Sequence, residues 1–229
     1  MLIVSSGALK TYKECPQKYN LIYNKHVEIP SDNKFAENGK KIHALINYKL
    51  KGADTENFEK SLNEQENKEL KTLWKNFLQT DISNIEKSEL AFELPLTEEI
   101  KLNGRIDALR QNNGKYEILD WKTGKPENVN PEKDFQTIIY LYSIFEILKF
   151  YKKIENCENL SISYVFLKEK TTKTVIFSAE KHKEYSKIIK DICEEINSVK
   201  TYKRNEKICN HCTYKIVCER AYGKNNHVL

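Results

Sequence analysis

The sequence predicts an α/β fold in which a mixed β-sheet is flanked by helices. Helical patterns dominate residues 6–79, three strand-like segments and a long helical segment follow, and two further strands precede a last long helix. Elements in this order are typical of an α/β core. No repeat, low-complexity stretch or long linker interrupts the 229 residues, so we expect a single domain over 1–229.

Apolar periodicity places the individual elements. The N-terminal helical part, residues 1–80, has breaks near 30–32 and 52–54 and an early helix over about 35–50. In the core, residues 85–200, we expect strands at 89–96, 101–110, 115–121, 161–167 and 174–178, and helices at 134–150 and 179–200. A charged turn, 168–171, joins the last two strands. The remaining part, 201–229, is rich in cysteine and is expected to join Cys15 through a metal cluster.

The second and third strands read as a hairpin, because Asn113-Gly114 favours a type I′ turn with positive φ at both central positions. In that register Asp107 faces Asp120, and Lys122 projects from the same face as Asp120. Facing carboxylates repel by roughly 0.2–1 kcal/mol. The pair is therefore expected to hold a divalent cation with an ammonium beside it, unless both carboxylates are simply solvated on an exposed sheet face.

The spacing of these residues resembles a known family. Gly104-x-x-Asp107 followed by Asp120-x-Lys122-Thr-Gly124 is similar to the motifs of the PD-(D/E)XK nuclease superfamily, in its RecB-like branch. The resemblance implies a restriction-endonuclease-like core and hydrolysis of phosphodiester bonds with Mg²⁺ or Mn²⁺. Asp-x-Lys alone is a weak motif, but its place at the end of an apolar strand after a tight turn makes it more specific.

Three further residues fit the same branch. Gln136 and Tyr140 are spaced i, i+4 and share one face of the long helix. Read without the resemblance, they are a surface amide and a core aromatic, and His43 in the early helix is a structural or exposed histidine. The resemblance implies instead that Gln-x-x-x-Tyr belongs to the site and that His43 completes the metal shell.

The roles that follow are those of a metal-assisted hydrolase. The expected ligands are His43, Asp107, Asp120 and the backbone carbonyl of Trp121. Lys122 would position or deprotonate the attacking water and stabilise developing negative charge. Gln136 and Tyr140 would hold Lys122 or contact the scissile strand.

Two charged residues are weaker candidates for the same site. Glu93 lies in the strand before the hairpin and could place its carboxylate near the metal, although an exposed strand-edge glutamate is commoner. Arg105 is expected opposite Lys122, where it would meet a phosphate or form a salt bridge with a surface acid.

A second metal site is expected from the cysteines. Cys209, Cys212 and Cys218 follow a Cys-x2-Cys-x5-Cys pattern, and Cys15 in Tyr-x-x-Cys-Pro supplies a fourth thiolate. The resemblance implies a four-cysteine [4Fe-4S] cluster, as in the AddB type and the CRISPR-associated Cas-four type. Such a cluster would clasp the two ends of the chain and stabilise the fold.

The spacing leaves a zinc site open as the alternative, because zinc and iron–sulfur clusters both accept thiolates in tetrahedral geometry. The zinc ligands would be the same four cysteines, or three of them with His211. Cys157 and Cys193 have no partner spacing and are expected to be buried thiols.

Composition is compatible with a nucleic-acid partner. The net charge is +5 and charged residues make up 31% of the chain, but many of the basic residues lie on helices that can be solvated faces. No apolar run reaches the ~18 residues of a membrane span, and the N-terminus lacks a charged n-region, so we expect no secretory signal and a cytoplasmic protein. No P-loop occurs, so an ATP-driven partner would be a separate chain.

The expected activity is a metal-dependent DNA nuclease, an exonuclease on single-stranded DNA or frayed ends, in recombination and repair or in CRISPR spacer acquisition. The alternative is a non-catalytic adaptor that binds DNA and docks onto an integrase-type or helicase partner. An intact Asp107, Asp120 and Lys122 set argues against the adaptor. A sequence-specific restriction endonuclease fits the cysteines and Gln-x-x-x-Tyr less well.

Overall fold

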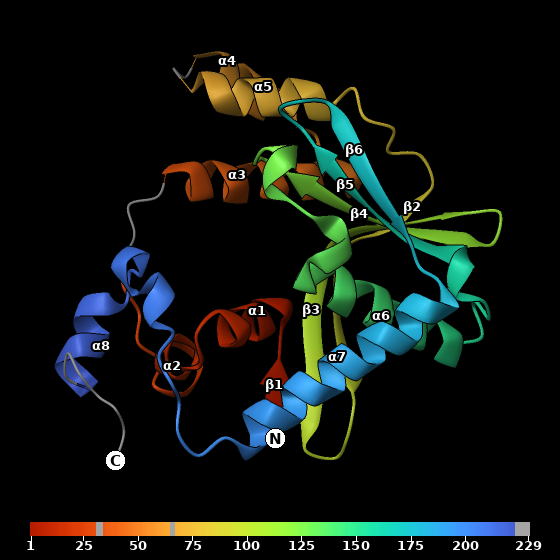
Figure 1. The fold of residues 1–229 in the computed structure, drawn as a ribbon. Helices are drawn as coiled ribbons and strands as arrows, with labels where there is room; N and C mark the ends of the chain where they lie inside the picture. The colour runs from red at the N-terminus through yellow and green to blue at the C-terminus, as the bar shows by residue number, and fades with distance from the viewer. Residues whose placement is uncertain (31–33, 65–66, 223–229) are drawn as a thin grey trace.

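A six-stranded mixed sheet forms the centre of the protein (Figure 1). The structure is a computed structural model that describes residues 1–30, 34–64 and 67–222. The strands run in the order β1-β3-β4-β5-β6, and β2 pairs with β3. Their bounds are β1 (Leu2–Val4), β2 (Ile85–Pro95), β3 (Ile100–Asn112), β4 (Lys115–Lys122), β5 (Leu160–Phe166) and β6 (Thr171–Ile176). The mixed α/β fold expected from the sequence is confirmed.

The helices precede, interrupt and follow the strands. The α-helices are α1 (Ser6–Glu14), α2 (Pro16–Tyr19), α3 (Lys34–Leu50), α4 (Glu56–Glu64), α5 (Lys68–Phe77), α6 (Phe135–Phe150), α7 (Ala179–Ser198) and α8 (Lys215–Tyr222). Short 3-10 turns, Pro126–Asn128 and Pro131–Lys133, lie between β4 and α6. In the described ranges, no helix is long and apolar enough to cross a membrane.

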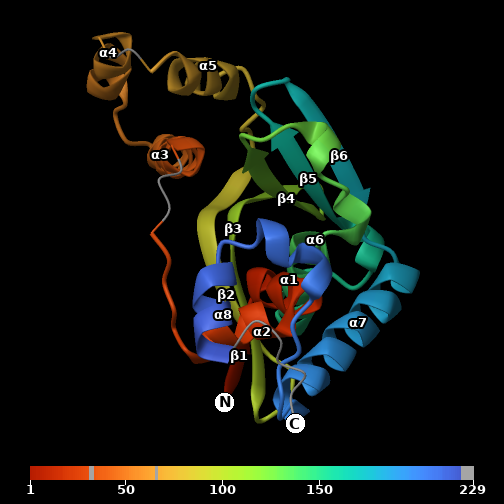
Figure 2. The ribbon, with the colours of Figure 1, turned by 60° about the vertical axis from the view of Figure 1, so that its left-hand side comes forward.

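The two faces of the sheet bury different helices (Figures 1 and 2). One face packs against α1, α6 and α7, in a core that includes Ile118 of β4 and Phe145 of α6. The other packs against α3 and α5, where Leu119 of β4 meets Ile42 and Trp74. Successive residues of β4 thus enter opposite cores, as the pleat of a strand requires.

The hairpin of β3 and β4 has the predicted register. Asn112 pairs with Lys115, and the ladder continues to Ala108 opposite Leu119. Asn113 and Gly114 have φ of 49° and 77°, the left-handed values that a type I′ turn needs. The ladder stops beyond Ala108, and the next strand-to-strand hydrogen bond runs from the Trp121 amide to the Asp107 side chain.

One edge of β3 is shared by two strands with an opening between them. β1 pairs in parallel with residues 100–102 of β3, and β4 pairs antiparallel with residues 108–112, while β2 occupies the other edge. Within the opening the hydroxyl of Tyr140 donates to the backbone carbonyl of Arg105 at 2.7 Å. The Trp121 amide donates to Asp107 Oδ2 at 2.9 Å. At the opening, α6 and β4 are therefore each joined to β3 by a hydrogen bond that involves a side chain.

Most sequence-based boundaries lie within a few residues of the observed ones, with two differences. β1 was not expected, and it is short because only three residues pair with β3. β6 begins at Thr171, so the predicted start at 174 and the inclusion of Thr171 in the turn were wrong; the turn closes at Lys170, whose φ is 55°. The break expected at 30–32 falls partly outside the described residues.

Gly104 of β3 permits the close approach of α6 to the opening. A Cβ at this position would lie 2.5 Å from Cζ of Phe92 and 3.0 Å from Cε1 of Tyr140. Phe92 and Tyr140 are buried and pack edge to face, so neither ring has room to withdraw. A glycine three residues before Asp107 is thus a packing requirement.

Gly104→Ala is expected to lower the free energy of unfolding by about 1–3 kcal/mol, because a methyl group would overpack the contact between β2, β3 and α6. Urea denaturation measures the difference. Gly39→Ala in α3 is the control, since its Cβ would meet only Thr123 Oγ1 at 3.7 Å and alanine favours helix. Equal stability of the two variants would contradict this account of Gly104.

Candidate functional site

The polar residues singled out in the sequence meet at the opening along β3. Asp107 comes from β3, Asp120 and Lys122 from the end of β4, Gln136 from the first turn of α6, and His43 from α3. These elements lie on both sides of the sheet and reach the opening because no strand of the described residues fills it. Five side chains from four elements thus converge on one place.

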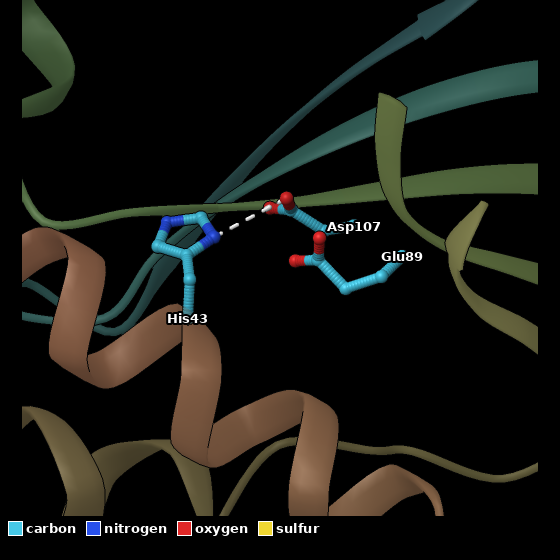
Figure 3. Close-up of side chains that lie close together, drawn as sticks. All are labelled: His43, Glu89 and Asp107. Atoms are coloured by element: carbon cyan, nitrogen blue, oxygen red, sulfur yellow. Dashed lines mark ion pairs between the residues drawn. The ribbon is translucent and has the colours of Figure 1, made fainter. Parts of the chain in front are cut away.

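Asp107 connects the strand to α3. Its Oδ1 lies 3.2 Å from Nδ1 of His43, and its Oδ2 accepts the hydrogen bond of the Trp121 amide. Figure 3 shows the imidazole of His43 directed at the Asp107 carboxylate, with the carboxylate of Glu89 beside it. One ligand atom from each of His43, Glu89 and Asp107 lies within 4.8 Å of the other two.

Asp120, Lys122 and Gln136 form a closed triangle. The Lys122 ammonium lies 2.7 Å from Asp120 Oδ2 and donates to Gln136 Oε1 at 2.7 Å. The Gln136 amide nitrogen donates in turn to Asp120 Oδ1. Asp134 caps α6 by accepting from the Gln136 backbone amide at 2.8 Å, which fixes the start of the helix that presents this side chain.

Aromatic residues form the wall behind the triangle. The Lys122 ammonium lies 4.9 Å from the centre of the Tyr164 ring, and the Tyr164 hydroxyl is hydrogen-bonded to Thr137 of α6. Burial is the main cause that raises the pKa of Tyr140 to about 12. Its hydroxyl therefore stays protonated at neutral pH and donates to the Arg105 carbonyl.

Burial and the neighbouring charges have opposing effects on the pKa values of Asp120 and His43, and both values are raised. Burial, and then the charge of Asp107, raise the pKa of Asp120 to about 6 against the opposing effect of Lys122. Burial lowers the pKa of His43, but the hydrogen bond and charge of Asp107 outweigh it, so the net shift is upward. A site whose carboxylates resist ionisation together is one that an added cation would stabilise.

Glu89 is a site residue that the sequence reasoning missed. Its neighbours in β2 pair as Ser88 with Ala108 and Leu90 with Ile106, which sets Glu89 opposite Asp107. Its φ is 49°, an uncommon value for a residue other than glycine, and strained backbone of this kind clusters at functional sites. The register between β2 and β3 would have revealed Glu89. That register could not be predicted, because the 96–100 loop that joins the two strands contains no glycine or asparagine to fix the turn.

Of the two weaker candidates, Glu93 lies away from the site and Arg105 borders it through Glu89. Glu93 is exposed and pairs with Lys101 at 3.4 Å, so its expected place near the metal was wrong: four residues farther along β2 it leaves the opening. Arg105 is also exposed, and its guanidinium lies 2.7 Å from Glu89. The salt bridge expected as the alternative for Arg105 is therefore present.

The donor set fits a hard divalent cation. Asp120 is 3% exposed, and its Oδ2 accepts no hydrogen bond of good geometry among the described residues, which leaves the Lys122 ammonium as its close polar partner. Carboxylate oxygens and a neutral imidazole suit Mg²⁺ or Mn²⁺. Among the described residues, His43, Glu89 and Asp107 are the ones whose ligand atoms lie close enough to share an ion. Asp120, expected as a ligand, is not part of this group, because its carboxylate is held by Lys122 and Gln136.

The four cysteines of the C-terminal pattern also lie together. Cys15, Cys209, Cys212 and Cys218 line one pocket with Arg204. The backbone amide of Asn205 donates to Cys15 Sγ at 3.4 Å, and the Cys209 thiol donates to the Asn205 carbonyl. His211 is exposed and is not among the residues that line the pocket. Cys157 and Cys193 are buried elsewhere, as expected.

Comparison with known proteins identifies the family. The model of the PD-(D/E)XK nuclease superfamily matches residues 3–219. The chain belongs to this superfamily. No curated protein matches it. Among solved structures, the crystal structure of SSO0001 is similar, with 18% identical residues, 95% of this chain and 86% of that chain covered, and a TM-score of 0.46.

Membership of the PD-(D/E)XK nuclease superfamily gives the acidic cluster a chemical meaning. These are metal-dependent nucleases, and the family model matches a range that includes Asp107, Asp120 and Lys122. Burying Asp120 works against folding, since burial and the nearby charge of Asp107 raise its pKa in the folded protein to about 6, above the ordinary value of an aspartate. The buried carboxylate of the candidate site is thus kept at the expense of stability.

Asp120→Asn is expected to gain stability relative to the wild type as pH rises from 4 to 7. The raised pKa of Asp120 means that the folded wild type binds a proton more tightly than the unfolded chain, so its stability falls as pH rises toward 6. The relative gain should be on the order of 2–3 kcal/mol, and urea denaturation in EDTA at several pH values measures it.

Glu93→Gln is the matched control, because Glu93 is exposed and its substitution should leave the pH dependence unchanged. Added Mn²⁺ should then raise the stability of the wild type but not that of Asp120→Asn. A pH-independent difference between Asp120→Asn and the wild type would contradict the raised pKa.

Proposed function

We propose that the protein is a deoxyribonuclease of the RecB-like branch that uses Mg²⁺ or Mn²⁺ and acts as an exonuclease on single-stranded DNA or frayed ends. The observation that carries the proposal is the meeting of Asp107, Asp120, Lys122 and His43 at the opening along β3. The whole chain would act as one nuclease domain.

The metal would be held by His43, Asp107, Asp120 and the backbone carbonyl of Trp121, with Glu89 as an additional carboxylate. When bound, the ion supplies Lewis acidity and lowers the pKa of a coordinated water. His43 would bind the metal as the neutral imidazole. It must then release the proton that the nearby Asp107 carboxylate stabilises by raising the pKa of His43. Metal affinity is therefore expected to weaken at acid pH, where both His43 and Asp120 hold protons.

Lys122 is suited to act on the attacking water and the phosphate. An ammonium group has three donors; Lys122 donates one to Gln136 Oε1 and lies 2.7 Å from Asp120 Oδ2 as an ion pair. A further donor is left for a water or a phosphate oxygen, where it would stabilise developing negative charge. Gln136 holds the ammonium and the carboxylate at once, and Tyr140 holds the strand at Arg105, so we assign both to positioning.

For the cysteine site we propose a [4Fe-4S] cluster held by Cys15, Cys209, Cys212 and Cys218. Four sulfur donors in one pocket support a metal there. The resemblance to the RecB-like branch, in which one early and three late cysteines hold an iron–sulfur cluster, supports the cluster over zinc.

The second candidate function is a DNA-binding adaptor that docks onto an integrase-type or helicase partner. Hydrogen bonds that hold Lys122 and Asp120 in place favour catalysis, because a binder has no need of a buried carboxylate. Recombination, repair and CRISPR spacer acquisition are the processes in which nucleases of this kind act, and we place the protein among them.

Asp120→Ala and Lys122→Ala are each expected to reduce DNA cleavage by at least about 10²-fold and to change DNA binding by less than about threefold, since both groups act on the reacting phosphate. Initial rates with Mn²⁺ and equilibrium binding with Ca²⁺ measure the two effects. Glu93→Ala is the control: it removes a carboxylate that belongs to the same sheet but lies away from the site, and it should retain full activity. Wild-type activity in Lys122→Ala would refute the assigned role.

Strands labelled at the 5′ or the 3′ end test the exonuclease. Incubation of single- and double-stranded DNA with Mn²⁺ should release short products from one end of the single strand. Cleavage of internal bonds in a closed circular single strand would argue against an exonuclease, and no cleavage with any divalent ion would support the adaptor.

Protein prepared without air is expected to be brown with broad visible absorption, because of the proposed cluster. Cys212→Ala should lose this absorption, whereas Cys157→Ala should keep it, since Cys157 is buried away from the pocket. A colourless preparation that contains zinc in proportion to the protein would favour the zinc alternative.

A further inference from the structure

A basic groove lies next to the proposed catalytic site. It has a volume of about 370 Å³ and is lined by residues of α1 and of the segment that leads into α6: Lys10, Lys13, Glu14, Asn130, Lys133, Asp134 and Phe135. α1 packs against α6, so the two walls are held together by the core (Figure 1). None of the roles assigned above uses this groove.

The cations of the groove are available, whereas its acids are engaged. Lys10 and Lys133 are exposed, and within the described ranges neither ammonium has an acidic partner. Lys13 has a single, long ion pair with Glu195 at 3.7 Å. Of the two acids, Glu14 pairs with Lys18 at 3.4 Å and Asp134 caps α6. The groove therefore presents an excess of positive charge.

The groove also adjoins the first turn of α6, which carries Gln136 of the candidate site. Asp134 lines the groove, and two residues later Gln136 hydrogen-bonds both Lys122 and Asp120. Phe135 and Asn130 add an aromatic ring and an amide to the lysines. Ammonium groups for phosphates and an aromatic ring for a base are the combination that binds a single strand without regard to sequence.

We propose that this groove, defined by Lys10, Lys133 and Phe135, binds the single-stranded DNA segment that adjoins the scissile phosphate. The proposal rests on the proposed nuclease function and names the path of its substrate. Lys10 and Lys133 would each contact a phosphate from opposite walls, and Phe135 would stack on a base. A duplex presents its bases only at their edges, so an aromatic ring that stacks on a base favours a single strand.

The double variant Lys10→Ala/Lys133→Ala tests the groove. We expect its affinity for a single-stranded oligonucleotide, measured by fluorescence anisotropy with Ca²⁺, to fall at least tenfold. The slope of log K against log salt should decrease by about 1.4, since each lost phosphate contact of a single strand accounts for ~0.7. With Mn²⁺, KM should rise by a similar factor while kcat stays unchanged.

Lys153→Ala/Lys187→Ala is the control, because it removes two exposed lysines, one beyond the far end of α6 and one on α7. It should keep the wild-type affinity and salt slope. Unchanged binding and KM in Lys10→Ala/Lys133→Ala, or an equal loss for duplex and single strand, would overturn the proposal. If the wild type cleaves no DNA, the nuclease function fails, whereas the binding measurement still decides the groove.

Discussion

The site depends on a strand edge that is left partly unpaired. Along β3, β1 and β4 each take a portion of one edge, and between them backbone groups would lack partners. Buried backbone groups without partners are costly, so side chains supply them: Tyr140 reaches the Arg105 carbonyl, and Asp107 accepts from the Trp121 amide. Those contacts place Asp107 against the end of β4, where Asp120 and Lys122 lie. The side chains that satisfy the unpaired backbone groups therefore also bring the residues of the candidate site together.

Asp120 shows how function and stability compete at this place. Its carboxylate is 3% exposed and beside Asp107, and both conditions favour the protonated form. The hydrogen bond from Gln136 and the ion pair with Lys122 compensate in part, and Asp134 holds Gln136 in position. The protein keeps this arrangement although an apolar residue would fit the buried position better, which is expected of a group retained for its chemistry.

Sequence reasoning reached the site because its strongest signal is local. Asn113-Gly114 fixes one turn, the turn fixes the register of β3 and β4, and the register sets the neighbours of Asp107 and Asp120. Glu89 was missed because the pairing of β2 depends on a loop without a turn signature. β1 was missed because a three-residue strand has no readable period, and it forms only where β3 offers it an edge. Local chemistry was predictable, whereas long-range pairing was not.

The cysteine site and the basic groove are connected through α1. This helix contributes Lys10 and Lys13 to the groove and ends at Cys15, its C-cap residue. Asn205 holds that end by hydrogen bonds to Cys15 Sγ and to the Glu14 carbonyl. A metal cluster at the four cysteines would therefore fix the helix that forms one wall of the groove. Loss of the cluster should weaken the binding of DNA before it alters the carboxylates and Lys122, which are held by β3, β4 and α6.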